Sequence, residues 1–230
     1  IVMHSLTKYI GGHGTSIGGI VVDGGNFDWT KNRKRQPLLN EPDQSYGGAV
    51  WIDAVPQLTG ANIPFVIRLR VVLLRDTGAP LAPFNAWQII QGLETVGLRM
   101  KQHCSNAEKV VTFLETQKKV QNVIYPTNHQ GEIKERALKY MKGGYGSLVG
   151  MDVGTKENGA KFIDNLKMLY HVANIGDARS LAIHPATTTH SQLNDKELLA
   201  AGVTPGYVRL SIGIEHPDDI IADIKQALAA

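Results

Sequence analysis

The sequence contains a single cysteine, Cys104. One thiol excludes an internal disulfide framework and leaves no partner for a CxxC metal or redox site. Cys104 lies in a stretch with helical periodicity, where a small buried side chain is favoured over a nucleophile. We therefore expect a reducing, cytoplasmic location.

Long apolar runs and a large charge excess are also missing. No run of about 18 apolar residues occurs, and no charged leader precedes an apolar core, so we expect no membrane association. The chain has 24 basic and 21 acidic residues, a net charge of +3. Its one dense basic cluster, residues 31–35, is short and reads as an exposed loop, so we expect no nucleic-acid partner.

Metal-site and hydrolase signatures are absent as well. The histidines, among them His4, His13, His184 and His190, show neither HxxxH nor HxH spacing and have no adjacent cysteines or clustered acids. We therefore expect no metal site. No GxSxG elbow occurs, which argues against a serine hydrolase of that type.

What is present predicts a mixed α/β protein with a packed core, since 43% of the residues are hydrophobic. Residues 1–3 and 19–22 read as short buried strands, 29–48 as a long loop, and 63–74 as an amphipathic helix. Residues 84–117 form either one long bent helix or two helices joined near His103. Further along the chain, strands are expected at 120–125, 147–153, 180–183 and 207–212, and helices at 132–141, 161–170 and 217–228. This alternation indicates a sheet with helices packed on a face.

The first nineteen residues carry the most chemical information. Lys8 follows two hydroxyls at one-residue spacing, Ser5 and Thr7, and precedes a run of glycines between residues 11 and 19. Hydroxyls and glycine backbone can approach a phosphate closely, while the lysine amine stays available for chemistry. The alternative is a solvated lysine beside glycines that only shape a tight connection.

A second candidate is Arg209, which stands in the apolar strand at 207–212. A planar guanidinium binds a carboxylate through two parallel hydrogen bonds, which suits an amino-acid substrate. The alternative is a structural salt bridge, for example with Glu215.

Several segments in this order resemble the Cys/Met-metabolism family of pyridoxal-phosphate enzymes, and within it the O-acetylhomoserine sulfhydrylases. They are residues 5–19 with 23–29, then 81–86 (LAPFNA), 91–95 (QGLET), 176–181 (GDARSL), 184–190 (HPATTTH) and 208–215 (VRLSIGIE). The resemblance covers essentially the whole chain, but only the C-terminal half of such enzymes. It implies a fold-type I transferase: residues 1–101 would be the latter part of the large cofactor domain, and 102–230 the small α/β domain. It also implies a homotetramer built from dimers.

The resemblance assigns roles to individual residues. It implies that Lys8 binds the pyridoxal 5'-phosphate aldehyde and moves protons, and that Ser5 and Thr7 bind the cofactor phosphate. Arg209 would grip the substrate α-carboxylate, the backbone of Ser180 would meet the same group, and Thr187 with Thr188 would line the pocket. Asn85, Asn174 and Asp177 read as caps or turn formers and are left outside the predicted site. The chain departs from the pattern at Gly47, where histidine is usual, and at Thr187, where serine is commoner.

The implied activity is a γ-replacement. O-acetyl-L-homoserine and sulfide, or methanethiol, would give homocysteine, or methionine, and acetate. The alternatives are methionine γ-lyase or cystathionine γ-synthase or γ-lyase chemistry, or a catalytically silent fragment that lacks the first half of the site.

Overall fold

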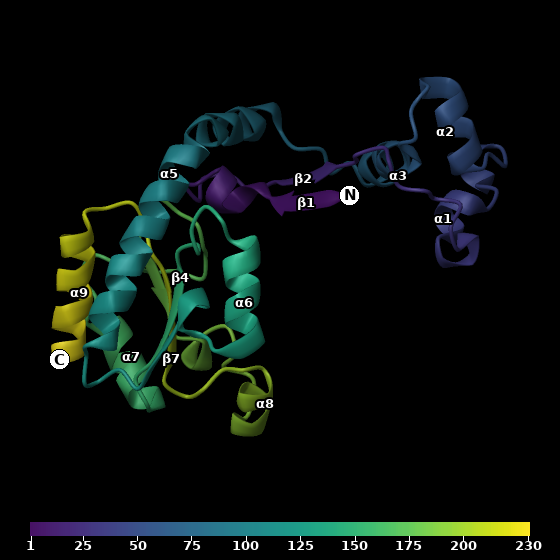
Figure 1. The fold of residues 1–230 in the computed structure, drawn as a ribbon. Coiled ribbons are helices and arrows are strands. Elements are labelled where there is room, and N and C mark those ends of the chain that lie inside the picture. The colour runs from purple at the N-terminus through teal and green to yellow at the C-terminus, as the bar shows by residue number, and fades with distance from the viewer. The chain divides into compact units, whose positions relative to one another are not determined.

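The computed structural model describes all residues from 1 to 230, which form two compact units. The first unit comprises Ile1–Leu6 and Gly18–Trp87, and the second comprises Thr7–Ile17 and Gln88–Ala230. Figure 1 shows the elements of both units. The domain boundary near residue 101, which concerns the longer enzyme, stays a prediction.

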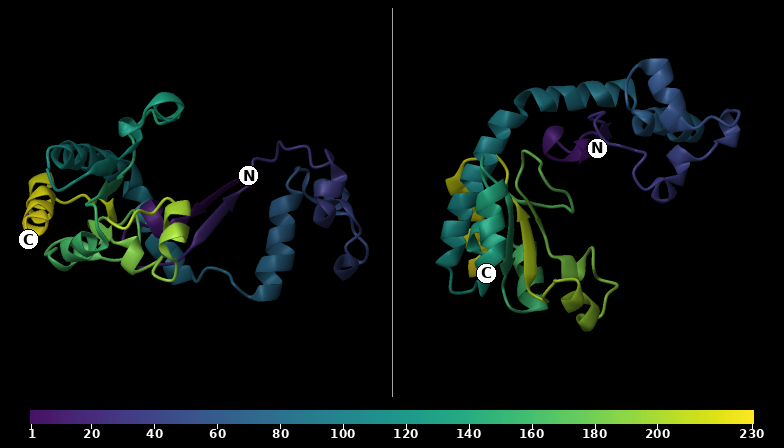
Figure 2. Two further views of the ribbon diagram at one scale, coloured as in Figure 1. Left: turned by 90° about the horizontal axis from the view of Figure 1, so that it is seen from below. Right: turned by 45° about the vertical axis from the view of Figure 1, so that its right-hand side comes forward.

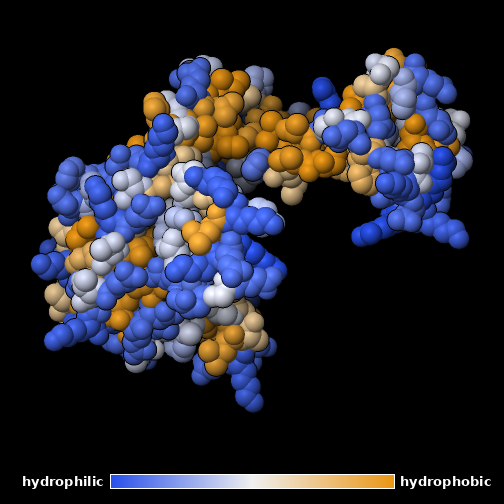
Figure 3. Space-filling view, viewed as in Figure 1, coloured by the Kyte–Doolittle hydropathy of each residue, from blue (hydrophilic) through white to orange (hydrophobic).

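The first unit opens with a hairpin. Strands β1 (Val2–Ser5) and β2 (Gly19–Val22) pair antiparallel, with Val2 opposite Val22 and Ser5 opposite Gly19. Both strands lie where the sequence predicts them, but the prediction that they are buried is wrong. Within this unit they pair only with each other, so their apolar side chains lie at the surface (Figure 3).

Short helices make up the rest of the first unit. They are α1 (Pro37–Asn40), α2 (Trp51–Thr59), α3 (Pro64–Arg68) and α4 (Arg75–Thr77), with a π-helical stretch, Leu69–Leu74, joining the last two. Their small core contains Trp29, Leu39, Trp51, Ile52 and Val55. The helix expected at 63–74 is confirmed, and residues 29–48 are mostly irregular, as expected. Helix α2 was not predicted, because Pro56 in its interior lacks a backbone N–H and breaks the sequence signal.

No single helix is long and apolar enough to span a membrane, although α2 and the α3–α4 stretch together pass a test of length and composition as a pair bent by 98°.

The second unit is built on a five-stranded sheet with the order β3-β4-β7-β6-β5. The strands are β3 (Asn122–Ile124), β4 (Leu148–Asp152), β5 (Tyr170–His171), β6 (Leu181–Ile183) and β7 (Tyr207–Ser211). Strands β5 and β6 are parallel and the other neighbours are antiparallel. Arg209 in the central strand β7 lies opposite Gly150 on one side and Ile183 on the other.

Three helices cover one face of this sheet: α5 (Pro83–Glu115), α7 (Lys156–Asp164) and α9 (Pro217–Ala229), while α6 (Gly131–Tyr140) lies on the other (Figure 1). The side chains of β7 alternate between the faces. Val208 and Leu210 are fully buried in the core under the three helices, and Tyr207 and Arg209 line the face with α6. A short helix, α8 (Asp195–Ala200), packs Leu198 against Ala186.

The structure settles one alternative and corrects one boundary. Residues 83–115 form a single helix, α5, which bends along its length (Figure 2). The helix expected at 161–170 instead begins at Lys156, where the Thr155 side chain caps it by accepting from the Asn158 amide. It ends at Asp164, since the amides of residues 167–169 donate to Asp223 rather than continue the helix. The other strands and helices predicted in this unit are confirmed.

Candidate active site

Lys8 lies in a tight π-helical turn, Leu6–Ile10, and is the residue at which the backbone angles leave the helical range. The carbonyl of Lys8 accepts a 2.8 Å hydrogen bond from the amide of Gly12, which closes the turn. Gly12 has a positive φ of 74°, a conformation that glycine adopts without a steric penalty. The glycine run therefore turns the chain back directly after the lysine.

The Lys8 amine reaches a residue that lies 166 positions away in the sequence. Its Nζ donates a 2.6 Å hydrogen bond to Oδ1 of Asn174, in the loop between β5 and β6. The backbone carbonyl of the same Asn174 accepts a long, 3.4 Å hydrogen bond from Nη2 of Arg209. Asn174 thus connects the two cations that the sequence singles out.

Arg209 is half-buried and stands beside an apolar hollow of about 540 Å³ between α6 and the sheet. Gly150, its neighbour on β4, adds no side chain next to it. Arg209 forms no salt bridge with a carboxylate, and the Glu215 carboxylate is engaged elsewhere. The alternative of a structural Arg209–Glu215 pair is therefore wrong, and the guanidinium has donors left to offer a ligand.

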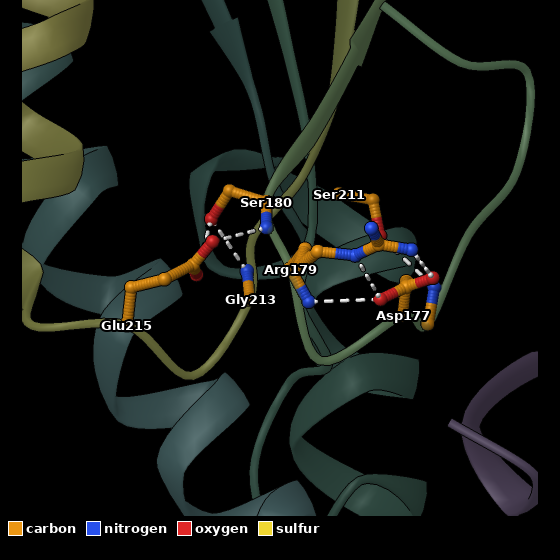
Figure 4. Close-up of polar contacts among 7 residues, drawn as sticks. Asp177, Arg179, Ser180, Ser211, Gly213 and Glu215 are labelled. Atoms are coloured by element: carbon orange, nitrogen blue, oxygen red, sulfur yellow. Dashed lines mark hydrogen bonds and ion pairs between the residues drawn. The ribbon is translucent and has the colours of Figure 1, made fainter. Parts of the chain in front are cut away.

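Ser180 contacts Glu215 rather than the lysine (Figure 4). Its amide donates to Oε1 of Glu215 at 2.6 Å and its hydroxyl to Oε2 at 2.8 Å, while the Gly213 amide donates to the same hydroxyl at 2.8 Å. This latch fixes the chain just after β7, and with it the end of the strand that carries Arg209. A contact between the Ser180 amide and a substrate carboxylate stays a prediction, because here that amide donates to Glu215.

Thr187 and Thr188 surround His184. The Thr187 hydroxyl lies 2.9 Å from Nδ1 of His184, and the Thr188 hydroxyl donates to the His184 carbonyl at 2.8 Å. Nε2 of His184 lies 2.8 Å from the Pro205 carbonyl, which can only accept, so Nε2 carries the hydrogen. Burial lowers the pKa of His184, which agrees with this neutral form. The hydroxyls of both threonines bond to His184, and neither is hydrogen-bonded to Lys8 or Arg209.

Ser5 and Thr7 flank Leu6, the first residue of the lysine turn. Ser5 is exposed at the end of β1, and Thr7 is half-buried. The Lys8 amine forms no salt bridge and meets a neutral amide oxygen. Hydroxyls, backbone amides and an amine that no carboxylate holds are the groups needed for a ligand that carries a phosphate and an aldehyde. The residues of this chain therefore fit pyridoxal phosphate.

Sequence reasoning missed Asn174, which it read as an ordinary turn residue. Its only signal in the sequence is its place two residues before the matching segment 176–181. Tyr9 and Arg99 were also missed: the Tyr9 hydroxyl lies 2.9 Å from the hydroxyl of buried Ser147, and Arg99 binds the backbone of the lysine turn.

Residues 1–229 match the family described as Cys/Met metabolism PLP-dependent enzyme. The chain therefore belongs to this family, whose cofactor is pyridoxal phosphate. The predicted family and the fold-type I α/β class are confirmed.

Individual relatives narrow the comparison. The chain is 49% identical to an O-acetyl-L-homoserine sulfhydrylase of Leptospira meyeri, over 99% of the chain and 52% of that protein. It is 45% identical to a homocysteine synthase of Schizosaccharomyces pombe, again over 99% and 52%. A crystal structure of a putative O-acetylhomoserine (thiol)-lyase from Campylobacter jejuni, described with N'-pyridoxyl-lysine-5'-monophosphate, superposes with a TM-score of 0.87 at 41% identity, over 99% of this chain and 53% of that one. The chain spans about half the length of the curated relatives it matches.

Proposed function

We propose that this chain works within a pyridoxal-phosphate enzyme that carries out γ-replacement on O-acetyl-L-homoserine. Sulfide or methanethiol would replace the acetate, giving homocysteine or methionine. The observation that carries the proposal is the connection Lys8–Asn174–Arg209, which joins an amine to a carboxylate-binding guanidinium through one residue. The sulfhydrylase and homocysteine synthase names of relatives support the choice of substrate.

Each residue has a distinct task in this proposal. Bound pyridoxal phosphate supplies an aldehyde for amines and a sink for electrons. Lys8 holds the cofactor and afterwards takes the proton from the substrate α-carbon at Nζ. Arg209 binds the substrate carboxylate with two parallel hydrogen bonds. Asn174 orients the Lys8 amine, and Ser5 and Thr7 bind the phosphate.

The latch around Ser180 and the threonines near His184 have supporting tasks. Glu215 and Ser180 hold the end of β7, so that the guanidinium of Arg209 keeps its direction. Thr187 lines the approach to the substrate. We further propose a homo-oligomeric enzyme that takes a small amino acid and a thiol, in a reducing compartment such as the cytoplasm, which suits a chain with one cysteine.

The test measures acetate release and thiol product from O-acetyl-L-homoserine, with and without sulfide, for the full-length protein and the 230-residue chain. We expect sulfide-dependent homocysteine formation by the full-length protein and its loss, by about 10²- to 10⁴-fold, in Lys8→Ala. Lys31→Ala, which changes an exposed lysine, is the matched control. Undiminished turnover in Lys8→Ala refutes the role of Lys8. Turnover of cystathionine or methionine alone refutes the γ-replacement, and a silent 230-residue chain beside an active full-length protein shows that this chain is insufficient by itself.

A further inference from the structure

Arg99 is a buried cation that no carboxylate neutralises. It lies in α5, is 5% exposed, and forms none of the salt bridges of the structure. Burying a charge without partners costs several kcal/mol, so such a group persists only where hydrogen bonds compensate it. The contacts of Arg99 therefore deserve a specific explanation.

The guanidinium donates to three backbone carbonyls. Nη1 donates to Tyr9 at 2.8 Å, and Nη2 donates to Ile10 at 3.1 Å and to Gly92 at 2.7 Å. Nε donates to the Thr95 hydroxyl at 3.1 Å. Two of the carbonyls belong to the residues that directly follow Lys8, and the other two acceptors lie on α5 itself. The side chain thus joins the helix to the lysine turn.

Two glycines make room for this contact. A Cβ on Gly12 would lie 2.5 Å from Cζ of Arg99, and a Cβ on Gly92 would lie 2.7 Å from the carbonyl oxygen of Ile10. Both separations are far below van der Waals contact. Gly92 therefore lets the backbone of α5 lie against the lysine turn, and Gly12 leaves the space that the Arg99 guanidinium occupies.

The same turn is held at its other end. The Gly12 carbonyl accepts from the Ala178 amide at 2.8 Å, and the Tyr9 hydroxyl contacts Ser147. Ala178 follows Asn174 by four residues in the same loop. The hydrogen bonds of Arg99 to the carbonyls of Tyr9 and Ile10 therefore fix the peptide groups between Lys8 and Gly12. Gly12 in turn is bonded to the loop that carries Asn174, the partner of the Lys8 amine.

We propose that Arg99 is a positioning residue for Lys8: by binding the carbonyls of Tyr9 and Ile10, it holds the turn in the geometry in which the Lys8 amine meets the cofactor aldehyde. This inference rests on the proposed function. Lysine cannot replace the planar guanidinium, because one ammonium does not reach three carbonyls in fixed directions and a side-chain hydroxyl as well.

The test uses site-resolved chemical trapping and does not depend on turnover. The full-length protein, stripped of cofactor, is mixed with limiting pyridoxal phosphate, borohydride fixes the adduct as a stable secondary amine, and peptide mass spectrometry gives the rate at each lysine. Exposed lysines such as Lys31 and Lys167 are the internal reference. We expect Arg99→Lys to slow labelling of Lys8 relative to the reference by about 10- to 100-fold, the effect of an ångström-scale misplacement.

The outcomes separate the two proposals. If the wild-type protein labels Lys8 no faster than the exposed lysines, the proposed function fails. If the wild type labels Lys8 selectively and a folded Arg99→Lys does so at the same ratio, the Arg99 proposal alone fails. Should Arg99→Lys not fold, Thr95→Val decides, since at an exposed helix position it removes the acceptor of Nε and, besides that, only the long 3.3 Å hydrogen bond from the Thr95 hydroxyl to the Gly92 carbonyl. If Thr95→Val lowers the ratio of Lys8 labelling to reference-lysine labelling severalfold while its stability in urea is unchanged, the proposal is supported. An unchanged labelling ratio overturns it.

Discussion

Gly92 offers a sharp test of how closely α5 must approach the lysine turn. A Cβ at this position would lie 2.7 Å from both the carbonyl carbon of Gly11 and the carbonyl oxygen of Ile10, and nearer still to the Gly11 oxygen. Since ordinary contacts are about 3.5 Å, the turn would have to move by about 0.8 Å or more. All three obstructing atoms are backbone, so no side-chain rotation relieves the overlap.

The magnitude follows from a comparison within the same helix. Gly97 is exposed in α5, and a Cβ there would meet nothing within 4 Å. Gly97→Ala should therefore raise the free energy of unfolding by about 1 kcal/mol through helix propensity alone. Gly92→Ala gains the same helix propensity, but the cost of overpacking against the turn should lower the free energy of unfolding by about 1–3 kcal/mol. We expect a value near the upper end, because the obstructing atoms are backbone. The two variants should thus differ by about that cost.

Urea denaturation of the 230-residue chain, followed by far-UV circular dichroism, measures the difference. The three tryptophans, Trp29, Trp51 and Trp87, all belong to the first unit, so their fluorescence follows that unit separately and should not change. If Gly92→Ala stabilises the chain as much as Gly97→Ala does, the close approach of helix and turn is refuted.

Two further predictions concern buried titratable groups. Asp223 accepts from the amides of Lys167, Met168 and Leu169 at 2.9 Å each, so Asp223→Asn should lower the free energy of unfolding by about 1.5–3 kcal/mol at pH 7, against Asp164→Asn as the exposed, charge-matched control. Burial raises the pKa of Asp223, but the hydrogen bonds from the three amides and from the Gln226 side chain together outweigh it and leave the pKa below its ordinary value of 3.8. The contribution of Asp223 is therefore complete above that value and is lost as the pH falls through the lowered pKa, so urea midpoints of variant and wild type should converge in strong acid; parallel curves would contradict this. For His184, burial disfavours the charged ring and lowers its pKa below the ordinary value of 6.5. As the pH falls, the unfolded chain therefore binds this proton before the folded chain does, and the free energy of unfolding should decrease below that value. Removing the ring with His184→Gln should flatten this acid slope between pH 5 and 7, as urea midpoints across that range will show, and an unchanged slope would exclude His184 as its source.

Local patterns in the sequence were sufficient for most elements of the second unit. The strand carrying Arg209 has apolar residues in alternation, and α9 begins with Pro217 and two carboxylates at its positive end. The start of α7 was not predicted because its first turn is polar and its large apolar residues begin only at Phe162. Helix α8 escaped because it is short, although Asn194 and Glu197 form a capping box.

The candidate site was only partly visible in the sequence. Lys8 and Arg209 were predicted because the residues next to them in the sequence, hydroxyls and glycines around Lys8 and an apolar strand around Arg209, indicate a ligand-binding role. The partner that connects them, Asn174, depends on a contact across 166 residues, and no local pattern encodes such a distance. The same holds for Arg99, whose acceptors on the turn lie about ninety residues away.

Strand β7 serves two purposes with alternate residues: Val208 and Leu210 fill the core, while Tyr207 and Arg209 face the hollow. A slip of one residue in its pairing would send the guanidinium into the hydrocarbon interior and expose two aliphatic side chains instead. In the proposed function, the register of this central strand therefore controls both the packing of the core and the binding of the substrate carboxylate. A one-residue deletion or insertion in β7 would disrupt both, whereas a substitution at Tyr207 or Arg209 would change the binding face and leave the core residues in place.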